Sequence, residues 1–347
     1  MKNRKREICT SGSVRDEDGQ PPHLLGRRNL LHLAAGAAAL PAVSRFAWAQ
    51  AYPTRPVRWV IGFPAGGGAD IVARIMARWL SERLGQQVII ENKPGAGMII
   101  ATQTVVNSPP DGYTLLWVGT SNAVNATLYE NLPFNFLRDI APVAGLVAYP
   151  LVLEVNPSVG LKTVAEFVAD AKTNPGKVSL ASFGVGTSSH MAGELLKSMT
   201  GINVVHVPYR GGAPMINDLL GGQVQAAVDV VANSLPHIRS GALRALAVTT
   251  TTRLEALPDV PTVDETVPGS EALTWTGIGV PRGTPTAIIE KLNRETNAGL
   301  ADQRIKARLA ELTIIPTIFS PAEFGAYWTA ETEKWSKVIQ AANIKPD

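Results

Sequence analysis

Short apolar runs alternate with longer amphipathic patterns along most of the chain, and this alternation restricts the fold more than any other feature. The first apolar run covers residues 57–63, and the first helical pattern covers residues 69–84. In that pattern Ile71, Ile75 and Trp79 share one face of a helix. Because strands that alternate with helices form sheets covered by helices, the sequence predicts an α/β fold.

The rest of the chain continues this rhythm. Further strands are predicted over residues 88–91, 113–118, 178–181, 204–207, 224–231, 243–248, 275–280 and 313–318. Further helices are predicted over residues 98–106, 163–172, 189–199, 215–220, 286–301, 303–312 and 322–342. Capping boxes, at Thr163 with Glu166 and at Ser320 with Glu323, support two of these helix starts, and Thr284-Pro285 supports a third.

Two breaks in the pattern indicate that the chain crosses twice between domains. One lies at Tyr149-Pro150, between two apolar runs, and the other follows the loop-rich residues 254–272. We expect one lobe to consist of residues 50–150 plus 274–347 and a second lobe to consist of residues 151–273. A cleft between two α/β lobes is a preferred place for a small ligand.

The first 49 residues have the composition of an export signal. Arg27-Arg28 precede an Ala- and Leu-rich run over residues 33–43, and Ala47-Trp48-Ala49 resembles a cleavage site. The alternative is a retained membrane anchor, but the run is too short to span a bilayer. The sequence predicts a twin-arginine-like signal that is cleaved near Ala49/Gln50, which places the mature protein in the periplasm.

Charge and cysteine content exclude several classes of protein. The one cysteine, Cys9, rules out disulfide scaffolds and cysteine-based metal sites. Eight of the 32 Lys and Arg but only four of the 29 Asp and Glu lie in residues 1–49. Residues 50–347 therefore hold 24 basic and 25 acidic residues, a net charge of −1. Such a body is not expected to bind nucleic acid, and no later apolar stretch is long enough to cross a membrane.

Two glycine-rich loops join a strand to a helix, one in each predicted lobe. They cover residues 63–70 and 183–190, and the polar run at residues 119–122 adds donors on the side of the first loop. A single loop of this kind is usually a tight turn. Two loops at helix starts could instead direct amide and hydroxyl donors toward a shared cleft, which suits a carboxylate held from both sides.

Six short motifs in a fixed order carry a family resemblance. They are Pro64-Ala65-Gly66-Gly67-Gly68-Ala69-Asp70, Glu91-Asn92-Lys93-Pro94-Gly95-Ala96-Gly97, Pro110-Asp111-Gly112-Tyr113-Thr114, Gly184-Val185-Gly186-Thr187-Ser188-Ser189-His190, Val207-Pro208-Tyr209-Arg210-Gly211-Gly212 and Leu257-Pro258-Asp259-Val260-Pro261-Thr262. Over residues 52–344 the chain resembles the Bug family of extracytoplasmic solute receptors. These TctC-like proteins are the substrate-binding components of tripartite tricarboxylate transporters.

The resemblance implies a type II periplasmic-binding-protein fold, in which two lobes close on a small carboxylate. It assigns ligand binding to residues of four segments: Phe63, Ala65, Gly66, Asp70, Ser121, Asn122, Gly186, Thr187, Ser188 and Asp229. It also implies a monomer that works without a cofactor and delivers its ligand to integral-membrane transporter subunits. The His and Pro often found in the family after Asn122 are absent here.

The sequence gives little support for a catalytic function. No G-x-S-x-G motif occurs, and no two histidines have the spacing of metal ligands. His190 is expected to be structural, His206 packed within a strand, and His237 on a short surface helix. Asp70 and Asp229 could form a catalytic carboxylate pair, but a helix-start carboxylate and a cleft acceptor are preferred.

Two alternatives to a transport receptor remain open at this point. One is a ligand-presenting protein for the sensor kinase of a two-component system, and the other is a secreted α/β hydrolase-like enzyme. The ligand is open too, among amino acids, dicarboxylates, citrate-like acids, aromatic acids and nicotinate-type compounds.

Overall fold

The structure is a computed structural model that describes residues 52–346. The strands are β1 (Val57–Ile61), β2 (Val88–Asn92), β3 (Thr114–Gly119), β4 (Ile140–Val155), β5 (Ser179–Ser182), β6 (Val205–Pro208), β7 (Ala226–Val230), β8 (Arg244–Val248), β9 (Leu273–Pro281) and β10 (Ile315–Pro316). The α-helices are α2 (Gly68–Leu84), α3 (Ile99–Val106), α4 (Thr120–Leu128), α5 (Phe136–Asp139), α6 (Val164–Thr173), α7 (Ser188–Thr200), α8 (Gly212–Leu220), α9 (Val231–Arg239), α10 (Thr286–Ala301), α11 (Gln303–Glu311) and α12 (Pro321–Ala342). Two short 3₁₀ helices cover Ala96–Met98 and Pro157–Val159. The alternation of strands and helices confirms the predicted α/β fold.

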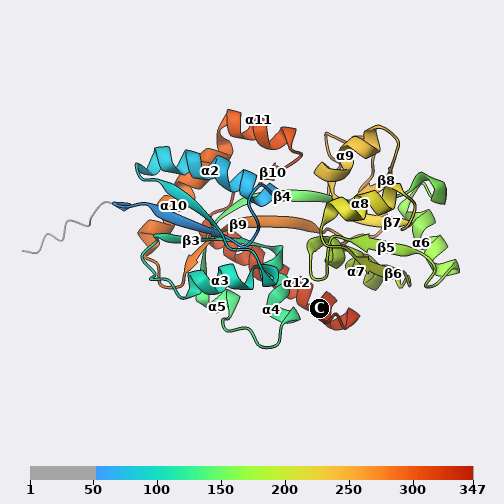
Figure 1. Ribbon diagram of the computed structural model, residues 1–347, viewed down its shortest axis with the longest axis horizontal. Coiled ribbons are helices and arrows are strands. Elements are labelled where there is room, and N and C mark those ends of the chain that lie inside the picture. Colours follow the sequence, from blue (N-terminus) through green and yellow to red (C-terminus); the bar gives the residue numbers. More distant parts are fainter. Residues whose placement is uncertain (1–51, 347) are drawn as a thin grey trace, which may run out of the picture. The chain divides into compact units, whose positions relative to one another are not determined.

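Two groups of parallel strands are joined by two long antiparallel strands. The strand order is β2-β1-β3-β9-β4-β7-β5-β6, with β8 and β10 also paired to β4. Neighbours within β2-β1-β3 and within β7-β5-β6 are parallel, whereas β9 and β4 run antiparallel to their neighbours. We call β1, β2, β3 and β10 with their helices the first lobe, and β5 to β8 with theirs the second lobe (Figure 1).

The strand β4 belongs to both lobes. Its first part pairs with β9 and β10, and its last part, from Leu151 to Val155, pairs with β7 and β8. The break expected at Tyr149-Pro150 therefore lies inside one continuous strand, and the loop-rich residues 254–272 lead directly into β9. Pro150 is tolerated because it sits where β4 exchanges one partner strand for another, a place where a missing N–H matters least.

Helices cover both faces of the sheet in each lobe. In the first lobe α2, α10 and α11 pack on one face around Met76, Leu80 and Leu292, and α3, α4 and α12 pack on the other (Figure 1). In the second lobe α6 and α7 cover one face, around Phe167 and Met191, and α8 and α9 cover the other. Because helices cover both faces of the sheet, most strands are buried on both sides, which explains why their sequences are continuous apolar runs.

The terminal helix α12 packs against α4 of the first lobe and α7 of the second lobe. Its start is the predicted capping box, in which Ser320 Oγ accepts from Glu323 N and the Glu323 carboxylate accepts from Ser320 N. At α6, Thr163 also caps the helix as predicted, but Glu166 accepts from Lys162 N instead of closing the box.

Two local expectations were wrong, and helix α4 was missed. The strand expected over residues 313–318 is only the two-residue β10, because Thr313 adopts a left-handed backbone conformation (φ 54°). Residues 120–128 form helix α4, which was not among the predicted helices. Thr284 does not cap α10; its hydroxyl donates to the carbonyl of Pro281, and Pro285 precedes the first helical residue. In the part of the chain that the structure describes, no helix has the length and apolar character to cross a membrane.

Candidate functional site

A cavity of about 510 Å³ opens at the carboxyl ends of the parallel strands of both lobes. Residues that follow β1 and β3 line it from the first lobe, and residues that follow β5 and β7 line it from the second. Tyr149 of β4 and Thr274, Trp275 and Thr276 of β9 line it where the lobes join. Its volume lies in the range of small-molecule sites, and its place is where α/β sheets usually bind ligands.

Five helices begin at this cavity. The lining residues include the first turns of α2, α4, α7, α8 and α9, which contribute residues such as Gly68, Ser121, Ser188, Gly212 and Asn233. The first amides of a helix have no acceptor within the helix, and the helix dipole makes this end positive. Five such ends directed at one space form a site for an anion.

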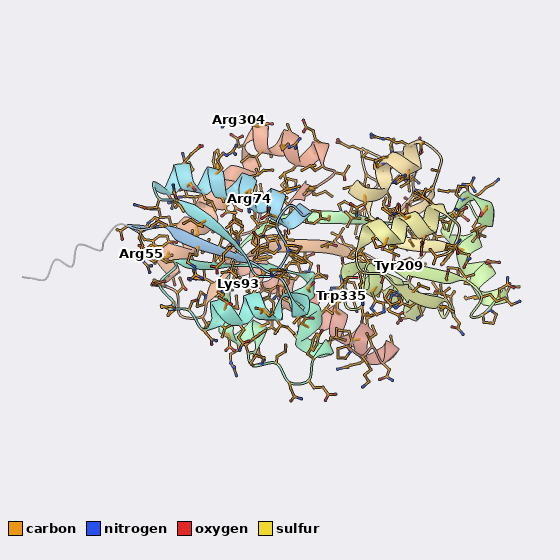
Figure 2. All side chains as sticks on the ribbon, in the orientation of Figure 1. Arg55, Arg74, Lys93, Tyr209, Arg304 and Trp335 are labelled. Carbon is orange, nitrogen blue, oxygen red and sulfur yellow. The ribbon has the colours of Figure 1, made fainter. Side chains whose placement is uncertain are left out.

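This positive character comes without a cationic side chain. Among the residues that line the cavity, all within residues 52–346, none is lysine, arginine or histidine. Arg74, on α2 after the first loop (Figure 2), has a side chain that is 55% exposed. Its guanidinium is paired with Asp70. An anion in the cavity would thus be held by amides and hydroxyls rather than by an ion pair.

Asp70 fixes the shape of the first loop. Its Oδ2 accepts from Gly66 N at 2.9 Å and from Arg74 Nε at 2.8 Å, and its Oδ1 accepts from Asn92 Nδ2 at 3.0 Å. These bonds, that to Arg74 above all, lower the pKa of Asp70 to about 2. The carboxylate is buried behind the loop and does not line the cavity, whereas Phe63 does.

Asn122 fixes the shape of the turn between β3 and α4, as Asp70 fixes the first loop. Its Oδ1 accepts from Gly119 N at 3.0 Å, and its Nδ2 donates to Thr102 Oγ1 at 2.8 Å. These bonds fix the turn between β3 and α4, so that Ser121 lines the cavity while Asn122 stays buried.

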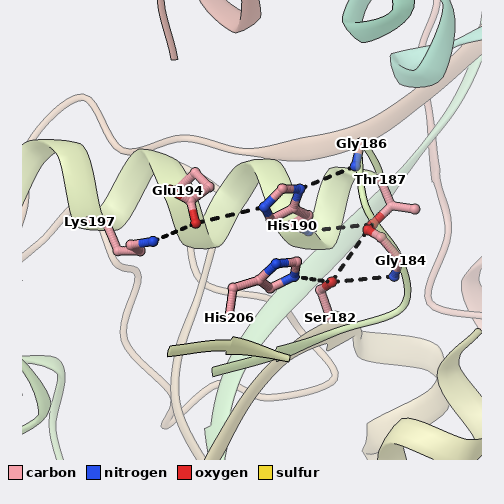
Figure 3. A network of polar contacts seen from close by, with 8 residues as sticks. All are labelled: Ser182, Gly184, Gly186, Thr187, His190, Glu194, Lys197 and His206. Atoms are coloured by element: carbon pink, nitrogen blue, oxygen red, sulfur yellow. Dashed lines mark hydrogen bonds and ion pairs between the residues drawn. The ribbon is translucent and has the colours of Figure 1, made fainter. Parts of the chain in front are cut away.

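The loop between β5 and α7 rests on a network of polar contacts (Figure 3). Thr187 Oγ1 donates to Gly184 O at 2.6 Å and accepts from His190 N at 3.4 Å, which caps α7. Gly186 N donates to His190 Nδ1 at 3.1 Å. These hydrogen bonds fix the loop, so that the start of α7 stays at the cavity.

Two histidines stack beneath this loop, as a structural pair. The rings of His190 and His206 lie 3.9 Å apart and nearly parallel, and His190 Nε2 faces Glu194, which also pairs with Lys197. His206 Nε2 lies 2.7 Å from Ser182 Oγ. Burial, with a contribution from His190, lowers the pKa of His206 to about 4, so this ring is neutral at neutral pH.

The hydroxyl of Ser188 links the second lobe to β9. Its Oγ is hydrogen-bonded to Thr274 Oγ1, and both residues line the cavity. The hydroxyl of Thr187 donates to Gly184 O, and the pair of Ser188 and Thr274 uses only one of its two O–H groups. The start of α7 thus offers its first backbone amides, and this pair one hydroxyl, as donors at the cavity.

Asp229 lies below the start of α9. Its Oδ1 accepts from Val230 N at 2.7 Å and from Asn233 Nδ2 at 3.2 Å, and Asn233 lines the cavity. Burial raises the pKa of Asp229 to about 6. The carboxyl group itself is fully buried and orients Asn233 from behind.

A second carboxyl group, that of Glu154, is buried beside Asp229. Glu154 Oε1 accepts from Ser234 Oγ at 2.7 Å, and Oε2 has no hydrogen-bond partner. Burial raises the pKa of Glu154 from its ordinary value of 4.5 to about 8. Between these two values the folded state binds more protons than the unfolded state, so the free energy of unfolding falls as the pH rises through this window.

Glu154→Gln should remove this dependence. We expect the free energy of unfolding of the wild type to fall relative to that of the variant by up to about 1.4 kcal/mol per pH unit between pH 5 and 8. Urea titrations at several pH values measure the difference. The control is Glu265→Gln, because the pKa of Glu265 is lowered to about 2 and this exposed carboxylate does not titrate in the window. Parallel pH profiles of the wild type and Glu154→Gln would contradict the assignment.

The structure divides the predicted site residues into three groups. Phe63, Ser121, Thr187 and Ser188 line the cavity. Asp70, Asn122 and Asp229 are buried behind it and hold the loops. Ala65, Gly66 and Gly186 belong to the same loops without lining the cavity.

Other lining residues were missed by sequence reasoning. Gly211 and Gly212 open α8, and a third glycine-rich helix start could have been recognised from the Val207–Gly212 motif. Met98, Trp117, Tyr149, Phe183 and Trp275 also line the cavity, but large apolar residues of buried segments give no signal that separates them from the core. Within residues 52–346 no group of three or more His, Cys, Asp or Glu side chains is arranged to hold a metal ion.

Comparisons with known proteins agree with this geometry. The family model described as "Tripartite tricarboxylate transporter family receptor" matches residues 72–344. Protein BugT of Bordetella pertussis is 36% identical over 300 residues, which cover 86% of this chain and 92% of BugT. The solved structure of R. palustris Rpa4515 with adipate has a TM-score of 0.75 and 35% identity, covering 85% of this chain and 100% of that chain. The structure of the periplasmic binding protein BugD has a TM-score of 0.72 and 34% identity, with coverage of 85% and 100%.

Proposed function

Because the chain belongs to the family of tripartite tricarboxylate transporter receptors, we propose that it captures a small carboxylate and delivers it to the membrane subunits of such a transporter. The family and its structural neighbours are periplasmic solute-binding proteins with two lobes, not enzymes. The observation that carries the proposal is the convergence of five helix starts on one cavity that has no cationic side chain. One structural neighbour is described with adipate, a carboxylate.

In this proposal the carboxylate accepts hydrogen bonds from both lobes. The amides at the starts of α2 and α4 donate from the first lobe, near Gly68 and Ser121, and those at the starts of α7 and α8 donate from the second. A hydrogen bond to a charged group contributes about 1.5–3 kcal/mol. Asp70, Asn122 and Asp229 act through the loops that they hold, because all three side chains are buried behind the cavity and bonded to those loops.

Closure of the lobes would bring these donors together. We place the lobes at residues 50–150 plus 274–347 and at residues 151–273, so that β4 and the start of β9 form the connection. The hydrogen bond between Ser188 and Thr274 lies at this connection and links the second lobe to β9. The protein acts as a monomer, without a cofactor and without turning its ligand over.

Calorimetric titration and thermal unfolding with a panel of acids test the function. The panel holds adipate, malate, citrate, glutamate and benzoate, each with its neutral amide as control. At least one acid should raise the melting temperature, because a ligand at 100 times its dissociation constant adds about 2.7 kcal/mol to the stability. No amide should bind, and the acid should be recovered unchanged. Binding of amides as tight as that of acids, or a reaction product, would overturn the proposal.

The membrane protein that binds the ligand-bound form distinguishes delivery to a transporter from sensing. Membrane vesicles that contain the transporter subunits should retain the protein only when an acid from the panel is present. Retention by vesicles with a sensor kinase instead would replace transport with sensing.

Export is a further expectation, and it concerns residues that lie outside the part of the chain that the structure describes. The predicted signal, with Arg27-Arg28 and Ala47-Trp48-Ala49, should be removed from the periplasmic protein. N-terminal sequencing should begin at Gln50 or within a few residues of it. A periplasmic form that retains Arg27 would contradict cleavage. Replacement of both arginines by lysine should stop export by the twin-arginine route, and unchanged export would indicate the general secretory route.

A further inference from the structure

The cavity has a second kind of wall besides the helix starts. Six large apolar residues line it: Phe63, Met98, Trp117, Tyr149, Phe183 and Trp275. They come from six separate segments of the chain, in both lobes and at the join. Met98, Trp117 and Trp275 are almost fully buried, whereas the rings of Phe63, Tyr149 and Phe183 are partly exposed. The helix starts offer amides to an anion, whereas these three exposed rings offer an apolar surface.

The ring of Trp275 is fixed with its polar edge bonded elsewhere. Its Nε1 donates to Glu331 Oε2 of α12 at 3.1 Å, and the ring makes edge-to-face contacts with Phe324 and Tyr327 at 5.9 and 5.7 Å. Tyr149 Oη donates to Gly68 O at 3.4 Å. These contacts fix the buried Trp275 behind the wall and the partly exposed ring of Tyr149 within it, so the apolar wall exists before a ligand arrives.

Phe63 differs from the other five because it is 37% exposed. It lies on the loop between β1 and α2, which also carries the helix start at Gly68. A ligand whose carboxylate reaches that helix start can cover the exposed ring of Phe63 with an apolar part of its own.

A second carboxylate on the ligand would be poorly compensated in this cavity. Away from the helix starts it would meet the electron-rich faces of aromatic rings, and it would lose water without gaining the amides that hold the first carboxylate. Asp229, behind Asn233, adds a carboxyl group on the side of the second lobe. The walls therefore suit an acid with one charge and an apolar remainder.

We propose that the ligand is an acid with a single carboxylate and an uncharged, hydrophobic ring, of the size of benzoate. This inference rests on the proposed function and deepens it, because it assigns the helix starts to the carboxylate and the exposed rings of Phe63, Tyr149 and Phe183 to the ring of the ligand. The flat ring of the ligand stacks on aromatic faces, and its carboxylate accepts hydrogen bonds from the amides.

Titration calorimetry with benzoate, benzamide, adipate and malate tests the inference. Benzoate should bind at least about tenfold more tightly than either dicarboxylate, and benzamide should not bind. Tighter binding of adipate or malate than of benzoate would overturn the inference and leave the proposed function intact. Binding of none of the acids, or equal binding of benzamide and benzoate, would overturn the proposed function as well.

Phe63→Ala adds a readout that depends on the wall alone. It should weaken the binding of benzoate about tenfold, because the ring of the ligand loses its apolar contact with Phe63. The fold should be unaffected, because Phe63 lies on an exposed loop that does not support the core. The matched control is Leu137→Ala, which removes a side chain of similar exposure, 36%, that does not line the cavity. Unchanged benzoate affinity in Phe63→Ala would contradict the assignment of the ring to this wall.

Discussion

Gly277→Ala should destabilise the protein by about 3 kcal/mol or more, with a loss of about 6–10 °C in melting temperature. Gly277 lies on β9, between β3 and β4, in the centre of the sheet. A Cβ at this position would lie 2.5 Å from the carbonyl oxygen of Ala144 and closer still to the ring of Phe324. The carbonyl belongs to a paired strand and cannot move aside, so the sheet or α12 must shift.

Thermal unfolding without ligand measures this effect. Gly221→Ala is the matched control, because Gly221 ends α8 in a right-handed conformation and its Cβ would meet no atom closer than 3.4 Å. The control should keep the wild-type melting temperature within about 2 °C. A Gly277→Ala variant as stable as this control would show that the contact between β9 and Phe324 is looser than described.

Enlarging Gly68 should abolish binding without harming the fold. Gly68 is the first residue of α2 and lines the cavity, and its Cβ would meet only Tyr149 Cε1, at 3.8 Å. A leucine there would extend into the space that the ligand needs and cover the helix start. We expect Gly68→Leu to weaken adipate, malate and benzoate at least about a hundredfold, or about 2.8 kcal/mol at 1.4 kcal/mol per factor of ten.

A size series separates blocking from misfolding. Gly68→Ala should bind with an affinity between those of the wild type and Gly68→Leu, and the melting temperatures of all three without ligand should agree. Gly221→Leu, the same change at a residue that does not line the cavity, should bind as the wild type does. If Gly68→Leu retains wild-type affinity, the start of α2 does not contact the ligand.

Much of the fold could be predicted because its signals are local. Most of the parallel strands are short apolar runs, and four of the helices that follow them, α2, α4, α7 and α8, begin at a glycine or a hydroxyl residue, as at Gly67 and Thr187. The long strand β4 could not be predicted, because Pro142 and Pro150 look like breaks. The structure places Pro142 at a register shift and Pro150 where the partner strand changes.

Helix α4 shows a second limit. Its sequence, Thr120–Leu128, contains two asparagines, two threonines and a valine, which have modest helix propensity. The helix is stabilised by contacts distant in sequence: α12 packs on it, and Asn125 Nδ2 donates to Gly97 O at 2.5 Å. Tertiary packing of this kind leaves no local pattern in the sequence.

For the site, both glycine-rich loops named from the sequence contribute residues to the cavity, but the direction of each side chain could not be predicted. Asp70 and Asn122 are polar residues at helix starts, which suggested contact with a ligand, yet both satisfy backbone amides behind the cavity. Tyr149 illustrates the opposite case, since a tyrosine within the apolar run of β4 looks like core and nevertheless lines the cavity. Both outcomes depend on side-chain direction, which only the assembled sheet determines.

The convergence of helix starts has an evolutionary consequence. Every residue except proline carries the same backbone N–H, so mutation of a side chain in these first turns leaves the anion-binding donor in place. The anchor for the carboxylate is inherited with the fold, while the opposite wall is free to diverge. After gene duplication, a copy could acquire a new acid by exchanging a few wall residues such as Phe63 or Phe183, without passing through a form that no longer binds acids.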